Sequence, residues 1–490
     1  WKPSVRHWRK TPPAADAPGK PMVLSGVVFL FRFLPIFFLL YFLVPKKAKN
    51  AVLLAGSLLF YAWGEPVYIV LMLFSTVSDY LHGMLIERNR GKRKAFYFLL
   101  SSLTINLAML GFFKYSSVNL PLPIGISFYT FQTMSYVIDV YRGDVPAQKN
   151  FLQFAVFVTM FPQLVAGPIV TYGDVAEQLK ERHASPENMA AGIVRFLVGL
   201  AKKVLLANNI GVLFTEVTSL SSEKMTTMSA WLCILAYAFQ IYFDFSGYSD
   251  MAIGLGKILG FTFPENFHYP YIARSITDFW RRWHMSLSGW FRDYVYIPLG
   301  GNRKGMKRQL LNIFIVWTLT GIWHGAGINF LLWGMWFALF LILEKLFLGK
   351  ILQKIPGFFG WLYTMFLVLL SWSFFSIEDG AVLANVWRSL FFRAPGGVFN
   401  REALYFWENY RLLFFLLAVC SLPLGKNAAE KIWRRLFCTE HVQSVKAKIL
   451  SCAGAASYTA LEILYLGGLF LLSVANIVDA SYNPFLYFRF

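Results

Sequence analysis

The chain has 490 residues, of which 57% are hydrophobic and only 15% are charged. A water-soluble protein of this length needs more charge to cover its surface, so the composition predicts an integral membrane protein. The formal net charge of +20 does not indicate nucleic-acid binding, because each basic cluster lies beside an apolar run. Short loops rich in Lys and Arg stay cytoplasmic, so these clusters should mark the inner face. The clusters are Lys46–Lys49, Arg88–Lys94, Arg274–Arg308 and Lys426–Lys448.

Long apolar runs predict membrane-spanning helices along most of the chain. A bilayer core of about 30 Å requires about 20 apolar residues per helix, which gives roughly ten to twelve membrane segments, some of them tilted, broken or re-entrant. The predicted fold class is therefore an all-α polytopic membrane protein. The runs are Val27–Val44, Ala51–Ala62, Val67–Leu81, Ala95–Phe113, Phe151–Met160, Leu310–Trp323, Phe330–Leu343 and Leu461–Val474. The loops at Glu216–Met228 and Ile377–Glu408 have balanced charge and are expected at the outer face.

The N-terminal residues 1–21 disagree with this topology. They are basic, yet alternation from the loop at Lys46 places them outside, against the positive-inside tendency. Because Met22 has the character of a natural start, we expect residues 1–21 to be an added or upstream extension. Residues 22–490 are then expected to form a single membrane domain.

The middle of the chain changes character. Pro121, Pro123 and Gly125 precede the half-polar stretch Ser127–Arg142, and prolines and a glycine interrupt the next apolar run at Pro162–Pro168. Irregular backbone at membrane depth is tolerated only inside protein or beside a water-filled cavity. We therefore expect the middle of the chain to line a cavity.

Acidic residues follow in the apolar stretch Ile241–Gly260, which contains Asp244, Ser246 and Asp250. Acids at membrane depth are costly unless they are paired or hydrated. Two interpretations stay open, namely a polar contact between helices and the wall of a polar reaction chamber. The glycines of the same stretch would allow a second helix to approach closely.

The segment from Arg274 to Asp293 predicts a helix lying in the plane of the inner membrane interface. Ser275 followed by Asp278 is typical of a capping box at a helix start. At about 100° per residue, apolar residues fall on one face and arginines fall on the other. The apolar face contains Ile276, Phe279, Trp280, Trp283, Leu287, Trp290 and Phe291. His284 lies at the edge of that face, where a histidine is more often structural than catalytic.

The next stretch, Tyr294–Arg308, contains a glycine-rich basic turn. Gly300 and Gly305 have the spacing of a phosphate loop. The sequence lacks the Lys and the Ser or Thr that such a loop requires, which excludes a nucleotide-hydrolysing site. Two interpretations stay open for Arg303 and Lys304: they hold the phosphates of a cytosolic acyl donor, or they belong to a cationic turn at the inner face.

His324 follows the apolar run Leu310–Trp323 within the sequence GIWHGAG. An ionisable residue at membrane depth is a functional-site hypothesis, and histidine is well suited to act as a general base near neutral pH. If the helix is straight, the residues from Arg308 onward bring His324 roughly 24 Å into the membrane, nearer the outer leaflet. On these residues alone, a structural histidine stays an alternative.

Cysteine content and missing motifs exclude several kinds of chemistry. The four cysteines are scattered, so neither a disulfide framework nor a metal site is expected. The sequence contains no GxSxG motif, which argues against a serine acyl-enzyme on this chain. It also shows no repeat of fixed period that would support an inverted-repeat transporter.

Three motifs resemble those of the membrane-bound O-acyltransferase family. They are FWRRWHMSLSGWFR at Phe279–Arg292, the following DYVYIPLGGNR, and GIWHG ending at Gly325. Shorter supporting stretches are Pro162–Ile169, Asp244–Gly254 and Tyr482–Phe490. The resemblance runs from Met22 to the C-terminus, with its motif core at 244–334. It points to the bacterial branch that includes the membrane component of alginate O-acetylation and the teichoic-acid D-alanylation protein.

The resemblance implies a ring of tilted helices, with interfacial and re-entrant helices around a central funnel. It places the family's invariant histidine at His324 and its second motif histidine at His284. His324 would act as general base on an acceptor hydroxyl, and His284 would position the donor or stabilise the oxyanion. Trp323 would shape the acyl slot. Arg281 and Arg282, together with the basic turn, would contact the donor phosphates.

The implied activity is O-acylation of a cell-surface or secreted polysaccharide. The acyl group, expected to be acetyl, would come from a cytosolic thioester such as acetyl-CoA, and no bound cofactor is expected. The implied setting is the bacterial cytoplasmic membrane, with an extracytoplasmic acetyltransferase as partner. Two alternatives stay open: D-alanyl transfer from a carrier protein to teichoic acid, and a transporter or conduit without chemistry of its own.

Overall fold

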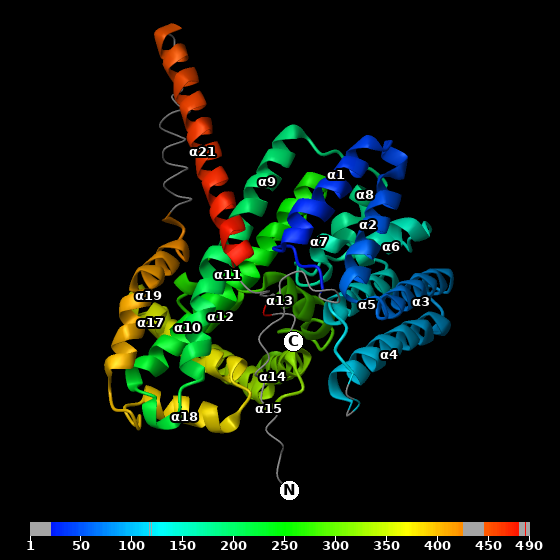
Figure 1. Ribbon diagram of the computed structural model, residues 1–490. Helices are drawn as coiled ribbons and strands as arrows, with labels where there is room; N and C mark the ends of the chain where they lie inside the picture. Colours follow the sequence, from blue (N-terminus) through cyan, green and yellow to red (C-terminus); the bar gives the residue numbers. More distant parts are fainter. Residues whose placement is uncertain (1–20, 117, 119, 425–444, 480–485, 487–490) are drawn as a thin grey trace.

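The computed structural model describes residues 21–116, 118, 120–424, 445–479 and 486, and every regular element in these residues is a helix (Figure 1). This confirms the predicted all-α class. The extension at 1–21, the basic cluster Lys426–Lys448 and the ending Tyr482–Phe490 lie largely outside the described residues. Four π-helical stretches extend neighbouring α-helices at Phe29–Phe33, Lys202–Ala207, Arg292–Tyr296 and Glu344–Leu348.

The first half of the described chain contains α1 (Leu34–Leu43), α2 (Lys49–Gly64), α3 (Ile69–Arg88), α4 (Arg93–Tyr115), α5 (Ile126–Arg142), α6 (Phe151–Thr159), α7 (Phe161–Leu164), α8 (Tyr172–Lys180), α9 (Pro186–Ala201) and α10 (Asn208–Thr218). The second half contains α11 (Thr227–Leu259), α12 (Ile276–Trp280), α13 (Met285–Phe291), α14 (Gly305–His324), α15 (Ile328–Leu343), α16 (Gly349–Leu352), α17 (Gly357–Ser376), α18 (Gly380–Leu390), α19 (Arg401–Cys420) and α21 (Val445–Asp479).

Within the described residues, seven helices are long and apolar enough to cross a membrane. They are α3, α4, α11, α15 with its continuation to Leu352, α17, α19, and α21 from Thr459 onward. Phe29–Leu43 is apolar but shorter. The other candidates are more polar, like α5, or broken, like the succession of α9, a π-helical stretch and α10. The chain is therefore a multi-pass membrane protein.

The long helix α11 forms the centre of the fold, and α9 packs along it (Figure 1). Two glycines on each helix make the close contact. A side chain at Gly192 would come within 2.6 Å of the Gly254 carbonyl oxygen, and one at Gly199 within 2.6 Å of the Gly247 carbonyl oxygen. Small residues at helix crossings let membrane helices approach closely, as expected for this glycine-containing stretch.

Loops expected on the same membrane face meet in the structure. The two loops expected at the outer face pair through their backbones, with the Thr227 amide donating to the Gly397 carbonyl at 3.1 Å. In the region expected at the inner face, Arg90 donates to the Val140 carbonyl at the end of α5, and Arg142 donates to the Asp293 carbonyl, both at 3.0 Å. Residues from the two basic clusters at 88–94 and 274–308 therefore both contact the end of α5.

The irregular segment between α6 and α8 is buried inside the protein and does not line the cavities described below, whereas Leu120 and Leu122 just before α5 do line one, as predicted for the middle of the chain. All residues from Met160 to Val170 are buried. Side chains satisfy part of its backbone, since the Phe161 amide donates to Ser57 Oγ at 3.1 Å and the Ile169 amide donates to Ser286 Oγ at 3.0 Å. These bonds allow a broken segment to lie at membrane depth.

The prediction of one continuous helix from Arg274 to Asp293 is wrong. The segment forms α12 and α13, separated by a turn at Arg281–His284. The turn is fixed from outside the segment, because the His268 amide donates to the Arg282 carbonyl at 2.9 Å and the Met285 amide donates to the Asn266 carbonyl at 3.0 Å. The predicted apolar face is buried throughout, and the Ser275 hydroxyl caps α12 by accepting from the Asp278 amide at 2.9 Å.

Candidate active site

His324 is the last residue of α14, which runs without a break from Gly305. Its side chain is buried. Close packing of α14 on α15 fixes its place, because a side chain at Gly321 would come within 2.6 Å of the Phe330 carbonyl oxygen, and one at Gly334 within 2.5 Å of the Trp317 carbonyl oxygen. The imidazole therefore sits at the end of a rigidly packed helix pair.

Three aromatic rings surround the imidazole of His324. The ring centroids of Trp323, Trp333 and Phe375 lie 4.8, 4.9 and 5.1 Å from it, all edge-on. Rings at this distance leave little room for water beside the imidazole. A polar contact between His324 and a ligand would therefore be only weakly screened.

A cavity of about 540 Å³ borders His324. Its polar lining includes Lys114 from the end of α4, Asn329 at the start of α15, and Glu378 after α17. The rest of the lining is Phe113, Leu120, Leu122, Gly325, Ala326, Gly327, Ile328 and Phe330. The loop charges that predict the outer face also apply to these ends of α4 and α17, so we expect the cavity in the outer half of the membrane. A pocket that combines apolar side chains with a few polar groups is typical of a small-ligand site.

Lys114 is the main residue of this cavity that the sequence did not indicate. Its ammonium group donates to the Trp323 carbonyl and to Ser127 Oγ at 3.4 Å, and lies 5.4 Å from the centroid of the Trp323 ring. The neighbouring Tyr115 hydroxyl donates to the Ile322 carbonyl. The last carbonyls of a helix have no partner inside it and carry partial negative charge, so Lys114 and Tyr115 cap the end of α14. A lone lysine ending the apolar run Ala95–Phe113 was the available signal.

His284 lies in the turn between α12 and α13 with a left-handed backbone (φ 44°, ψ 54°), which is uncommon for a residue with a side chain. Its Nδ1 lies 3.0 Å from the Asn266 amide oxygen, which also accepts from Ser286 Oγ at 3.0 Å. The Asn266 amide nitrogen donates to Ser249 Oγ at 3.0 Å. Because the Asn266 oxygen is an acceptor, this network assigns the proton of the neutral imidazole to Nδ1 and leaves Nε2 as an acceptor atom.

Burial governs the charge of His284. It lowers the pKa of His284 to about 3, because the charged imidazolium would lose its hydration. The ring also packs against Phe245, with centroids 4.7 Å apart. His284 is therefore neutral at physiological pH.

The two predicted histidines lie in adjoining aromatic surroundings. Aromatic side chains connect their surroundings. The ring centroid of Trp372 lies 4.9 Å from that of Trp283, the neighbour of His284. It lies 6.4 Å from the ring centroid of Trp333, which is beside His324. The Phe131 ring stacks between the rings of Trp290 and Trp323, with centroid distances of 3.8 and 5.2 Å. The predicted site residues His284, Trp323 and His324 thus belong to one region rich in aromatic side chains.

The three predicted chamber residues of α11 are not among those that line the cavity. Asp244 is buried in an ion pair with Lys203, and its second oxygen accepts from the Leu486 amide at 2.9 Å. Asp250 pairs with Lys202 at 2.6 Å and with Arg195 at 2.9 Å. Ser246, between them, is buried. These contacts favour the first interpretation above, a polar contact that joins α11 to α9 and its extension.

The four predicted donor-binding cations lie away from the cavity. Arg282 pairs with Asp278 at 2.8 Å, whereas Arg281, Arg303 and Lys304 are exposed. The last two precede α14, so about 30 Å of helix separates them from His324. In the described part of the chain, no group of His, Cys, Asp and Glu has the arrangement of a metal site.

The fold and site together define a class of protein, a polytopic helical membrane enzyme with a buried histidine beside a ligand-sized cavity. The sequence comparison gives the family. The family model described as "MBOAT, membrane-bound O-acyltransferase family" matches residues 144–387. The "Probable alginate O-acetylase AlgI" of Pseudomonas putida is 38% identical over 96% of this chain and all of its own length. The chain therefore belongs to the membrane-bound O-acyltransferase family, and it is a membrane O-acyltransferase.

Two further relatives cover less of the chain. The "Peptidoglycan O-acetyltransferase" of Helicobacter pylori is 35% identical over 73% of this chain and 77% of its own length. The "Teichoic acid D-alanyltransferase" of Bacillus subtilis is 29% identical over 46% of this chain and 59% of its own. The matched region of the family model contains both histidines.

Proposed function

We propose that the enzyme acetylates a polysaccharide outside the bacterial cytoplasmic membrane, using a cytosolic acyl thioester such as acetyl-CoA. The observation that carries this proposal is that His324 ends the unbroken helix α14 and borders a ligand-sized cavity. From the loop charges we place the start of α14 at the inner face and the cavity in the outer half. A histidine in this place can serve an acceptor that arrives from outside. The names of the two more extensively matched relatives, an alginate O-acetylase and a peptidoglycan O-acetyltransferase, support an acetyl group and a polysaccharide.

In the proposed reaction His324 acts as the general base. Its imidazole takes the proton of an acceptor hydroxyl while the hydroxyl oxygen attacks the thioester carbonyl. The tetrahedral oxyanion then collapses, the carbon–sulfur bond breaks, and the departing thiolate takes the proton from the imidazolium. The products are an O-acyl ester and a free thiol, so no further reactant is needed.

Lys114 is suited to stabilise the oxyanion. Its ammonium group lies at the same cavity as His324 and is held at the end of α14 by the Trp323 carbonyl. A preorganised cation beside a developing negative charge lowers the barrier without reorganisation. His284 fits the other predicted role, positioning, because its Nδ1 proton is directed to Asn266 and Nε2 has no proton to donate.

The donor is proposed to enter from the inner face, where the exposed Arg281, Arg303 and Lys304 can attract its phosphates. Trp323 packs beside His324 and would shape the acyl slot. The acceptor on the outer side is either the polysaccharide or an extracytoplasmic acetyltransferase that passes the acetyl group on. D-alanyl transfer stays the rival activity, and its supporting relative matches 46% of the chain.

The test uses the full chain reconstituted in liposomes, with radiolabelled acetyl-CoA on the inner-face side and polysaccharide on the other. We expect labelled polysaccharide with the native chain and with His183→Gln, a control at an exposed histidine. We expect none with His324→Gln. Equal labelling by the native chain and both variants would refute the role of His324. If label reached the acceptor only from a D-alanyl carrier protein, the donor would be that carrier and not acetyl-CoA.

A further inference from the structure

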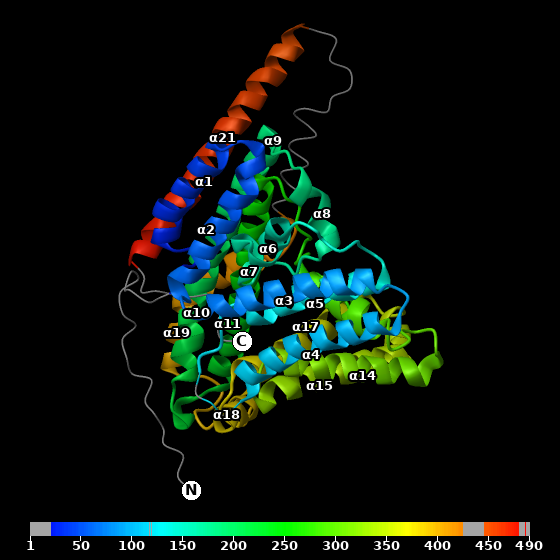
Figure 2. The same ribbon diagram turned by 90° about the vertical axis from the view of Figure 1, so that its right-hand side faces the viewer.

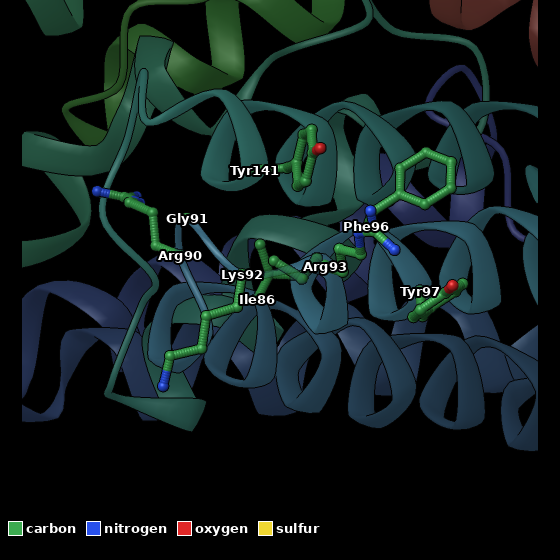
Figure 3. A pocket seen from close by; sticks show the side chains of 9 residues that line it. Ile86, Arg90, Gly91, Lys92, Arg93, Phe96, Tyr97 and Tyr141 are labelled. Atoms are coloured by element: carbon green, nitrogen blue, oxygen red, sulfur yellow. The ribbon is translucent and has the colours of Figure 1, made fainter.

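Helices α3 and α4 lie side by side (Figure 2). A second cavity, of about 670 Å³, lies where α3 is followed by α4 (Figure 3). It includes the first residue of α4, whereas the His324 cavity includes Lys114 near the last. Three cationic residues, Arg90, Lys92 and Arg93, belong to its lining. The remaining lining residues are Ile86, Gly91, Ala95, Phe96, Tyr97 and Tyr141, so the lining contains no acidic residue. We call this site the α3–α4 pocket. The proposed acyl transfer does not use it.

The cations of the α3–α4 pocket lack acidic partners. In the part of the chain that the structure describes, none of the three takes part in an ion pair. Glu87, an acid in the preceding turn of α3, accepts instead from the Ala147 amide at 2.9 Å. Arg90 is anchored to the end of α5 through the Val140 carbonyl at 3.0 Å. The pocket therefore holds uncompensated positive charge.

The start of α4 adds to this charge. Helix N-termini carry partial positive charge and favour acidic residues, yet the first turn of α4 contains no acid and the residue before it is Lys92. Lysine and arginine have no acceptor atom for the free amides of the first turn. An anion bound in the pocket would satisfy both the helix end and the cations.

The surroundings of the pocket identify the kind of anion. Phe96 and Tyr97 are 50% and 62% exposed, and the exposed apolar face continues along α4 at Leu100 and Leu107. Exposed aromatic rings at the end of a membrane helix belong to the interface belt, where lipid headgroups lie. Basic residues at the inner face also attract anionic lipids. A lipid could therefore place its phosphate in the pocket and its acyl chains along α4.

The distance to His324 argues against the acyl donor as the occupant. The α3–α4 pocket includes Arg93, at the first residue of α4, and the His324 cavity includes Lys114, near the last. About 30 Å of helix separates them. A donor held in the α3–α4 pocket would have to leave it before its thioester could reach His324, so the donor is not a resident occupant of this pocket. We propose that the α3–α4 pocket binds the phosphate headgroup of an anionic phospholipid of the inner leaflet.

The test measures lipid binding to the full chain in detergent by native mass spectrometry. The probes are dioleoylphosphatidylglycerol and, as the zwitterionic control, dioleoylphosphatidylcholine. The variant Lys92→Gln/Arg93→Gln removes two exposed cations of the pocket. The matched variant Lys46→Gln/Lys47→Gln removes two exposed cations of the same membrane face, before α2 and outside the pocket lining. Unchanged thermal unfolding midpoints without added lipid show that both variants are folded.

We expect phosphatidylglycerol to bind in preference to phosphatidylcholine, and the pocket variant to weaken this binding roughly 30-fold, because two cations beside a lipid phosphate are lost. The matched variant should keep the native affinity to within about twofold. Equal weakening by the two variants, or no preference for phosphatidylglycerol, would overturn the proposal. Displacement of the lipid by coenzyme A or inorganic phosphate at equal concentration would also overturn it, in favour of a soluble phosphate.

Discussion

The two histidines of the site occupy different surroundings. His324 ends an unbroken helix, contacts three aromatic rings and borders a cavity of about 540 Å³. His284 lies in a turn between two short helices, with a left-handed backbone and a bond to Asn266. The first histidine has access to a ligand, whereas neighbouring polar groups hold the second in one orientation.

This difference teaches which property of a buried histidine indicates its role. A general base must reach the proton that it removes, and only a residue at a cavity meets that condition. A left-handed backbone at a residue other than glycine costs about 1–3 kcal/mol and persists where the surroundings enforce it. We therefore interpret His324 as the residue that exchanges a proton and His284 as a residue that positions its neighbours.

The largest expected effect is the loss of activity when His324 is replaced. Without that loss, the distinction between the two histidines would not hold. His324→Gln should lower the transfer rate by roughly 10²–10⁴-fold, the usual contribution of a general base. It should leave the thermal unfolding midpoint close to that of the native chain, because glutamine has a similar size. The measurement is the initial rate in liposomes together with the unfolding curve. A large loss of stability would assign His324 a structural role instead.

The next effect concerns the cation beside His324. Lys114→Met should lower kcat by about 10²-fold if the ammonium stabilises the oxyanion. Lys114→Arg keeps a donor and a positive charge and should restore part of the rate. A cap on α14 without a catalytic role predicts a different result, in which Lys114→Met lowers the unfolding midpoint and changes kcat little.

A smaller effect is expected at the support of His284. Asn266→Ala removes the acceptor of the Nδ1 proton and should lower the free energy of unfolding by about 1–3 kcal/mol. The transfer rate should fall about tenfold, as for a positioning residue. Asn209→Ala, at an exposed asparagine on α10, is the control.

The pH dependence of the transfer rate distinguishes a positioning role of His284 from a role in proton transfer. The pKa of His284 is lowered to about 3 by burial, so its imidazole stays neutral between about pH 5 and 8. His284→Gln should therefore reduce the rate without moving the pH profile in that range. A shifted profile would show that His284 titrates during catalysis and would contradict its positioning role.

The smallest effect should fall on donor binding. Arg303→Gln/Lys304→Gln removes two exposed cations about 30 Å of helix away from His324. We expect about a threefold rise in KM for acetyl-CoA with kcat unchanged, because these residues would act before chemistry. An unchanged KM would assign them to a cationic turn of the inner face.

Much of the architecture could be predicted from the sequence because it depends on local composition. Apolar runs of bilayer length predict helices wherever they occur, since the backbone must satisfy its own hydrogen bonds in lipid. The same reasoning placed His324 at the end of a straight helix, and α14 confirms this helix. Segments that the loop charges assign to one face also contact one another or share the end of α5 as a contact.

The break at His284 could not be predicted from local pattern. The apolar spacing of 276–291 fits one helix, and the bonds that end it come from His268 and Asn266, which precede the segment. Likewise, the acids of α11 allowed two interpretations, and the pairing of Asp244 with Lys203 depends on how α9 and its extension pack on α11.

By itself, the sequence determined the helical class, the membrane setting, the grouping of the loops and the two histidines that resemble the family's motifs. Only the tertiary structure decided that Lys114 caps the helix of His324, that Asn266 sets the proton of His284, and that Asp244 and Asp250 are paired. The physical reason is the distance along the chain over which each interaction acts. Hydropathy and helix geometry act within one segment, whereas a cavity, an ion pair or a shared proton requires atoms from segments that only folding brings together.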